Sequence, residues 1–231
     1  MNSQPVQIPD IYLGQGFSNE QIKASLEKGG LSYVFHEDIE ERIAKLLVEG
    51  YVVARFNGKM EYGPRALGNR SILYQPNDRS VNDWLNINLK RTEFMPFAPS
   101  VLAEELDKCF INHKGAVGTG RFMTITFHCT EWMQKNCAGV VHLDNTARPQ
   151  IVREKDNSSY YKIIKEFQKL TGVPMIINTS FNIHEEPIVC TPDDAIRAFK
   201  LGHLDYLAIG DFLAKNNSTL NHKLTPYCQT I

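Results

Sequence analysis

Hydrophobic and polar positions follow two patterns along the chain. In some segments apolar residues recur with the period of a helix, and in others they form short continuous runs. In the first fifty residues, apolar positions recur every three or four residues, which predicts helices over 19–28 and 37–49. Ser18 and Gln21 form a capping-box pair at the start of the first helix. An apolar run at 51–56 then predicts a buried strand.

The rest of the chain predicts further helices and strands. Thr191, followed by Pro192 and two acidic residues, marks the start of another helix. The other predicted elements are helices at 81–90, 103–110 and 159–170, strands at 97–102, within 121–129, at 140–143, 173–178 and 206–209, and a turn at 179–182. Because the elements alternate without an internal repeat, the expected class is α/β, with α+β as the alternative.

Composition and charge narrow the possible functions. The 25 Lys and Arg residues nearly balance the 26 Asp and Glu residues, so no overall basic field favours nucleic acid or an acidic membrane surface. No apolar run approaches the ~20 residues of a membrane span, and residues 1–10 lack the pattern of a signal peptide. Five cysteines without a CxxC pair predict reduced thiols in a cytoplasmic protein. Because the overall charge is balanced, any anion-binding site must be formed by a local group of cations.

The densest chemical signal is the segment Gly58–Ser71, GKMEYGPRALGNRS, which holds three glycines, a proline and three cations. Glycines allow the backbone to approach a ligand closely, and arginine binds phosphate oxygens in pairs. The segment lacks the GxxxxGK[ST] pattern of a P-loop. From the residues alone, two interpretations stay open: an anion-binding loop that Lys90 and Arg91 could also reach, or a tight turn with surface cations.

Two further segments carry polar side chains at close spacing. The first, His142–Gln150, has no paired histidines and is therefore a poor metal site. It is either an acid–base group or a turn in which Asp144 caps His142. The second, Asn178–Asn182, follows a predicted strand, where small polar side chains suit ribose or phosphate. An Asx or ST turn explains this spacing equally well.

Together these segments resemble a known family. GKMEYGPRALGNRSIL, FMPFAPSVL, HLDNTARPQIV and TGVPMIINTSFN, followed by EPIVCTPDDAI, occur in the order found in the C-terminal domain of O-carbamoyltransferases that modify nodulation factors and antibiotics. The resemblance covers residues 10–215. It implies a YrdC-like fold over 36–231, a twisted sheet with flanking helices and a basic concave face. Residues 1–35 would then be an arm that joins a Kae1-like domain.

The resemblance also implies a function, the formation of carbamoyl adenylate from carbamoyl phosphate and ATP accompanied by Mg²⁺. A Kae1-like domain, in cis or in trans, would hold iron and transfer the carbamoyl group, so no metal is expected on this chain. The residues implied in catalysis are Arg65, Lys90 and Arg148. Those implied in binding nucleotide and carbamoyl phosphate are these three together with Asn69, Arg70, Asn178, Ser180 and Asn182. Two alternatives are a nucleotide-binding module without turnover and a YrdC-like protein associated with RNA.

Three positions depart from the family's pattern. Met95 stands where many relatives have arginine, and one residue is missing between Lys90 and Pro96. Glu185 stands where many relatives have glycine. The first change removes a cation and the second shifts Lys90 along the chain. Together with Glu185, they would either retune the site or mark a domain that binds nucleotide without turning it over.

Overall fold

The main sheet has eight strands in mixed orientation. The computed structural model describes residues 10–78, 87 and 97–216. In spatial order the strands are β1 (Tyr33–Phe35), β11 (Phe212–Lys215), β10 (Tyr206–Ile209), β2 (Val53–Phe56), β3 (Arg70–Tyr74), β9 (Met175–Ser180), β4 (Ala98–Leu102) and β8 (Gln150–Val152). The pairs β2–β10 and β4–β8 are parallel and the other neighbours antiparallel. The described sheet is thus mixed, with five antiparallel and two parallel pairs, in an α/β fold.

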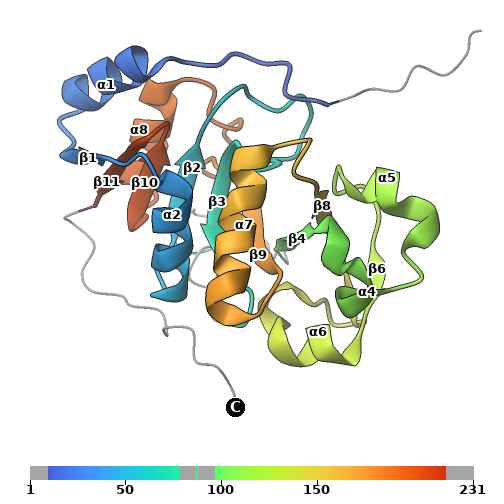
Figure 1. The fold of residues 1–231 in the computed structure, drawn as a ribbon. Coiled ribbons are helices and arrows are strands. Elements are labelled where there is room, and N and C mark those ends of the chain that lie inside the picture. The colour runs from blue at the N-terminus through green and yellow to red at the C-terminus, as the bar shows by residue number, and fades with distance from the viewer. Residues whose placement is uncertain (1–9, 79–86, 88–96, 217–231) are drawn as a thin grey trace, which may run out of the picture.

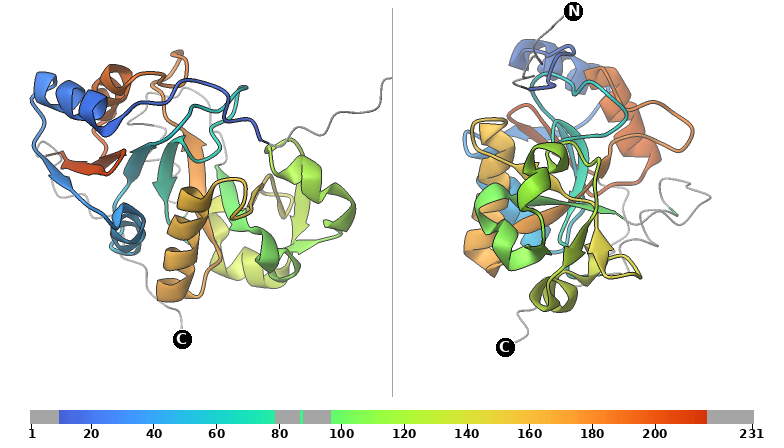
Figure 2. Two further views of the ribbon diagram at one scale, coloured as in Figure 1. Left: turned by 45° about the horizontal axis from the view of Figure 1, so that its top comes forward. Right: turned by 90° about the vertical axis from the view of Figure 1, so that its right-hand side faces the viewer.

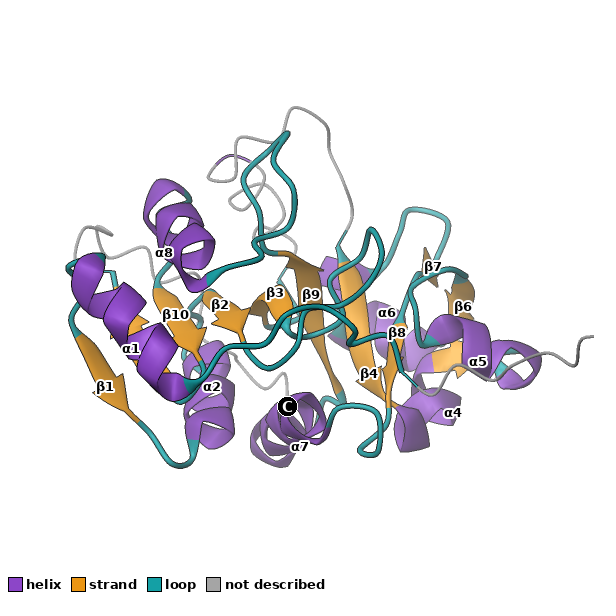
Figure 3. Cartoon of the chain, turned by 90° about the horizontal axis from the view of Figure 1, so that it is seen from above, coloured by secondary structure: helices purple, strands orange, loops and turns teal. Residues whose placement is uncertain are grey.

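Helices cover both faces of this sheet (Figures 1 and 3). The helices α2 (Ile39–Val48) and α7 (Ser158–Thr171) pack side by side on one face. On the other face, α1 (Asn19–Lys28) packs against α8 (Pro192–Leu201). Each helix turns an apolar stripe toward the sheet. Burying one such Leu, Ile or Phe side chain contributes about 1.5–3 kcal/mol, so this sandwich is the main source of stability.

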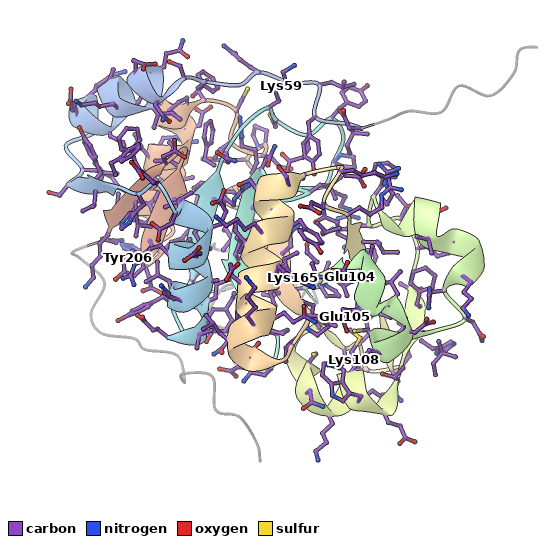
Figure 4. The ribbon with its side chains drawn as sticks, in the orientation of Figure 1. Lys59, Glu104, Glu105, Lys108, Lys165 and Tyr206 are labelled. Atoms are coloured by element: carbon purple, nitrogen blue, oxygen red, sulfur yellow. The ribbon has the colours of Figure 1, made fainter. Side chains whose placement is uncertain are left out.

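A smaller lobe is formed by the chain between β4 and β8 (Figure 2). Its antiparallel sheet consists of β5 (Phe110–Ile111), β6 (Phe127–Cys129) and β7 (Thr146–Ala147). Its helices are η1 (Ala103–Glu105), α4 (Leu106–Cys109), η2 (Lys114–Ala116), α5 (Val117–Gly120), α6 (Glu131–Asn136) and η3 (Ala138–Val140). Polar contacts tie η1 to α7, because Glu104 accepts from Lys165 and Glu105 from Gln168 (Figure 4).

Residues 10–35 pack onto this core. Backbone hydrogen bonds join the segment 11–15 to the loop between β2 and β3, from Gly14 N to Met60 O and from Tyr62 N to Ile11 O. Beyond this segment, α1 and β1 complete the sheet and its cover. Among the described residues, no helix is both long enough and apolar enough to span a membrane.

Several sequence predictions are confirmed and others are wrong. The capping box predicted at Ser18 forms, and the helix start predicted at Thr191 is confirmed, with Thr191 as N-cap and Pro192 in the first turn. The strand predicted within 121–129 keeps only its last three residues, and Met123, in the part that is not a strand, has a left-handed φ of 54°. The segment 140–143 is not a strand: it ends a 3₁₀ helix and enters a turn.

Two predicted boundaries also move, and one prediction lies outside the described residues. The turn expected at 179–182 begins only after β9, which continues through Ser180. The strand β3 begins at Arg70 and so takes in the last two residues of the glycine-rich segment, where a loop was expected. The helix predicted at 81–90 falls largely on residues that the structure does not describe.

Candidate functional site

The loop between β2 and β3 is held in shape by a buried carboxylate. Glu61 is 5% exposed, and its Oε1 accepts backbone N–H groups of Leu67 and Asn69 at 2.7 Å and of Arg70 at 3.2 Å. Hydrogen bonds to an ionised acceptor are among the stronger ones in proteins. Glu61 therefore folds the backbone that carries the candidate arginine side chains.

Arg70 stabilises this loop from within. Its side chain is fully buried, and its guanidinium lies 3.6 Å from the centre of the Phe56 ring. The guanidinium donates to the backbone carbonyls of Gln15, Asn57, Gly58 and Asn69. Burial lowers the pKa of Arg70 to about 10, so it stays charged at neutral pH. The geometry gives Arg70 a positioning role.

A second buried arginine, Arg55, was not anticipated as a site residue. It donates to the carbonyl of Gly68 at 2.6 Å, to Asn69 Oδ1 at 3.1 Å and to Ser159 Oγ at 2.7 Å. Asn69 is also fully engaged, because its Nδ2 donates to the carbonyl of Lys59. The sequence signal for Arg55 was a lone charge inside an otherwise apolar strand.

Arg65 and Arg148 face one open pocket with a volume of about 470 Å³. The other lining residues are Ile11, Tyr62, Pro64, Leu67, Phe122, Met123 and Thr124. Within the part of the chain that the structure describes, neither guanidinium has a hydrogen-bond or ion-pair partner. Burial lowers the pKa of Arg148, and the positive charge of Arg65 lowers it further. Two cations that converge without a counter-ion favour an anionic ligand.

Asn178 belongs to a polar cluster behind the loop. It is 1% exposed, and its Nδ2 donates to Gln150 Oε1 at 2.9 Å, Ser100 Oγ at 3.1 Å and the Ala66 carbonyl at 3.2 Å. Gln150 in turn donates to the Leu67 carbonyl. Asn178 Oδ1 is buried without a partner among the described residues. A buried acceptor left unpaired costs about 1–3 kcal/mol, so this oxygen is suited to a donor from a ligand or water.

Ser180 and Asn182 form the turn that follows β9. Ser180 Oγ donates to Asn182 Oδ1 at 2.6 Å, and Asn182 Nδ2 donates to the carbonyls of Ile183 and Glu186. These contacts form the kind of turn that was one of the two interpretations of this segment. Glu185 lies exposed in the same turn with a left-handed φ of 64°, the conformation that glycine adopts without strain.

The His142–Thr146 segment is also a turn. Asp144 Oδ1 accepts the backbone N–H of Thr146 at 3.0 Å and its hydroxyl at 2.7 Å. His142 Nδ1 lies 3.1 Å from the same hydroxyl oxygen. Asp144 therefore caps Thr146, and not His142 as the sequence suggested. In the described residues, no group of three or more His, Cys, Asp or Glu side chains is placed to hold a metal ion.

The predicted site residues thus fall into separate groups. Arg65 and Arg148 meet at the pocket, whereas Asn69, Arg70 and Asn178 lie in the buried networks that support it. The nominated Lys90, together with Arg91 and Met95, lies outside the described residues.

The fold places the protein among YrdC-like α/β domains. T. kodakarensis HypF matches it with a TM-score of 0.54 at 18% identity, over 79% of this chain and 22% of that one. A variant of P. abyssi Sua5 matches with a TM-score of 0.52 at 15% identity, over 76% of this chain and 48% of that one.

The chain belongs to the carbamoyltransferase family, because the model of the carbamoyltransferase C-terminus matches residues 44–216. Nodulation protein NolO of Bradyrhizobium diazoefficiens is 36% identical over 231 residues, which is 95% of this chain and 42% of NolO. An uncharacterized protein of Methanocaldococcus jannaschii is 40% identical over 213 residues, 88% of this chain and 34% of that protein. The chain thus spans less than half of the length of either relative.

Proposed function

We propose that this domain forms carbamoyl adenylate from ATP and carbamoyl phosphate, as the C-terminal part of an O-carbamoyltransferase. The observation that carries the proposal is the pocket in which Arg65 and Arg148 converge without a counter-ion among the described residues. Membership of the carbamoyltransferase family supports a carbamoyl-transfer chemistry for it. A HypF structure of similar fold is described as phosphate- and nucleotide-bound, which is consistent with the proposal.

The pocket has the two kinds of surface that a nucleotide requires. Arg65 and Arg148 supply charge for phosphate oxygens, and Tyr62 and Phe122, which line the same pocket, supply aromatic surface. Purine rings stack on aromatic side chains, and arginine binds phosphate oxygens in pairs. We assign the phosphates to Arg65 and Arg148, and the base to Tyr62 and Phe122.

The reaction has a defined balance. Water cleaves carbamoyl phosphate to carbamate and phosphate, and a carbamate oxygen then attacks the α-phosphorus of ATP. The bond to pyrophosphate breaks, so the products are carbamoyl adenylate, pyrophosphate and phosphate. Negative charge grows on the α-phosphate and on the leaving pyrophosphate. In the proposal Arg65 and Arg148 stabilise this charge, and Lys90 joins them.

The remaining groups have supporting roles in the proposal. Glu61 and Arg70 hold the loop, while Asn178, Ser180 and Asn182 contribute amide and hydroxyl groups near the carboxyl end of β9. Mg²⁺ enters with ATP, bound mainly by phosphate oxygens and water. A Kae1-like domain with its own iron accepts the product and transfers the carbamoyl group.

The test is to incubate the chain with ATP and carbamoyl phosphate and to measure pyrophosphate. Release should require both substrates, because ATP alone offers no carbamate. Arg148→Ala and Lys90→Ala should each slow release by at least ~100-fold, the usual loss on removing a preorganised charge. Ser180→Ala should slow it less, since a neutral donor contributes ~0.5–1.5 kcal/mol. Lys59→Ala is the matched control, because this cation of the same loop is exposed (Figure 4) and is not among the residues that line the pocket.

Two outcomes count against the proposal. Release that is indifferent to Arg148 and Lys90 would exclude the charge-stabilised mechanism. A wild-type chain that binds ATP without releasing pyrophosphate would instead be a binding module. In that case Met95→Arg, which restores the cation of the family pattern, tests whether turnover has been lost at this position.

A further inference from the structure

The pocket of Arg65 and Arg148 is lined by residues from both parts of the molecule. Arg65 lies in the loop between β2 and β3 of the core, whereas Phe122 and Arg148 come from the small lobe, the chain between β4 and β8 (Figure 2). Phe122 lies just beyond the end of α5. How well a base can stack on Phe122 therefore depends on what fixes this end of α5 against the core.

Close packing alone does not hold Phe122. This residue lines the open pocket and also a small cavity of about 20 Å³, whose lining includes Tyr12, Arg121, Gln150 and Asp156. Atoms that face a void make fewer dispersion contacts than atoms in a filled interior. Since Phe122 is also partly exposed, the orientation of its ring depends on its remaining contacts.

The neighbouring Arg121 supplies one of these contacts. Its guanidinium carbon lies 5.0 Å from the centre of the Phe122 ring, within the ~6 Å range of a cation–π interaction. Arg121 Nε donates to Asp156 Oδ2 at 3.0 Å, and the two side chains are only 13% and 14% exposed. A charge-assisted hydrogen bond that is largely shielded from water is stronger than an exposed one. Asp156 thus fixes the guanidinium that lies against Phe122.

Asp156 is itself fixed by the loop between β8 and α7. Its two carboxylate oxygens accept from Nε and Nη2 of Arg153 at 2.6 and 2.7 Å. The next residue, Asn157, caps α7, and its Nδ2 donates to Asn69 Oδ1 at 2.9 Å. Asn69 belongs to the glycine-rich segment of the core. The same short loop therefore contacts the core at Asn69 and the small lobe at Arg121.

We propose that Asp156, acting through Arg121, positions the Phe122 ring as a surface on which the base of the nucleotide stacks. Asp156 and Arg121 are then positioning residues, because neither is among the residues that line the pocket. This inference rests on the proposed function, since it takes ATP as the ligand of the pocket. It assigns to these two residues a share of the affinity that the base contributes.

The test compares ATP with tripolyphosphate, which has the phosphates but neither base nor ribose. Phe122→Leu removes the stacking surface and should weaken ATP binding about tenfold, measured by calorimetry with Mg²⁺ present. Asp156→Asn should weaken it about fivefold, because one carbonyl oxygen cannot accept from both arginines as the carboxylate does. Both variants should bind tripolyphosphate within about twofold of wild type, since Arg65 and Arg148 are unchanged.

A double variant shows whether Asp156 acts through Phe122. Independent losses multiply, so Phe122→Leu/Asp156→Asn would then bind ATP about fiftyfold more weakly than wild type. If Asp156 only positions the ring, the double variant should match Phe122→Leu within about twofold. Arg121→Met is the second variant in case Asp156→Asn does not fold, because it leaves Asp156 paired with Arg153. The same fivefold loss is expected, again with no further loss when it is combined with Phe122→Leu.

Two control variants leave the contacts of Arg121 in place. Arg153→Met removes only the second arginine bound to the same carboxylate, and Glu104→Gln weakens another contact between the small lobe and α7, at Lys165 (Figure 4). Both should bind ATP within about twofold of wild type. A loss at either control as large as at Arg121→Met would mean that attachment of the lobe in general shapes the pocket, which overturns the inference.

The results separate this inference from the proposed function. A wild-type chain that binds ATP and releases pyrophosphate, together with a Phe122→Leu variant of unchanged ATP affinity, overturns the inference alone, because the base then lies elsewhere. Losses that multiply in the double variant also overturn it, as does an equal loss of tripolyphosphate affinity in Asp156→Asn. A wild-type chain that binds neither ligand and releases no pyrophosphate overturns both.

Discussion

The positive charge of Arg65 lowers the pKa of Arg148 across their shared pocket. Two guanidinium groups that repel one another make the empty pocket less stable than the occupied one, so removing either should cost affinity but not folding. We expect Arg65→Ala to weaken ATP binding by ~1.5–3 kcal/mol, the range for charge-assisted hydrogen bonds. Calorimetry measures the affinity, and Lys59→Ala is the control. Unchanged affinity in a folded Arg65→Ala protein would exclude this pocket.

The same substitution should destabilise the protein at Arg70 but have little effect on its stability at Arg65. Arg70→Lys leaves several buried carbonyls without a donor, because one ammonium cannot reproduce the planar guanidinium. The free energy of unfolding should fall by ~3 kcal/mol, measured by urea denaturation. Arg65→Lys, at the open pocket, should change it by less than ~0.5 kcal/mol. Equal stability of the two variants would contradict the positioning role of Arg70.

Two glycines of the same loop provide a matched pair. Gly63 and Gly68 both have positive φ, 115° and 111°, so alanine is strained at either position. A Cβ at Gly63 meets nothing within 4 Å, whereas one at Gly68 would lie 2.5 Å from the Tyr160 ring. Gly68→Ala should therefore lower the free energy of unfolding further than Gly63→Ala, by an additional ~1–3 kcal/mol from overpacking, as measured by urea denaturation. Equal losses would show that backbone strain alone decides the cost.

Buried thiols should make the protein sensitive to alkali. Burial raises the pKa of both Cys109 and Cys129 to about 12, while an unfolded cysteine ionises near pH 8.5. Between these values the unfolded state binds fewer protons, so stability falls as pH rises, by ~1.4 kcal/mol per pH unit for each thiol. Denaturation at pH 8, 9, 10 and 11 measures the slope. Cys129→Ala removes one of these thiols, so the slope should become shallower by ~1.4 kcal/mol per pH unit. An unchanged slope would contradict the raised pKa of Cys129.

Local rules in the sequence predicted the parts of the fold that they control. Ser18 and Thr191 mark helix starts because a hydroxyl there satisfies a free backbone N–H, and both caps form. The small lobe was harder to predict, since strands of two or three residues have too few positions to show alternation. Met123 and Asn145 also interrupt the pattern with left-handed backbone that nothing in their identity requires.

The sequence predicted residues of the candidate site, but not which way their side chains would point. Spacing placed Arg65 and Arg70 in one cationic loop, yet it could not indicate that one guanidinium would turn inward to carbonyls and the other outward to a pocket. That choice depends on Phe56, at the end of the strand before the loop, and on the segment 11–15, which lies elsewhere in the chain. The contact of His142 Nδ1 with the Thr146 hydroxyl likewise depends on the folded turn, which the spacing of these residues did not define.

The hydrogen bonds between the segment 11–15 and the loop make this segment a structural part of the site. Ile11 belongs to the pocket wall, and the Gln15 carbonyl accepts from Arg70. The outline of the pocket and one of the four acceptors that hold Arg70 in place thus come from a stretch of chain more than forty residues before the loop itself.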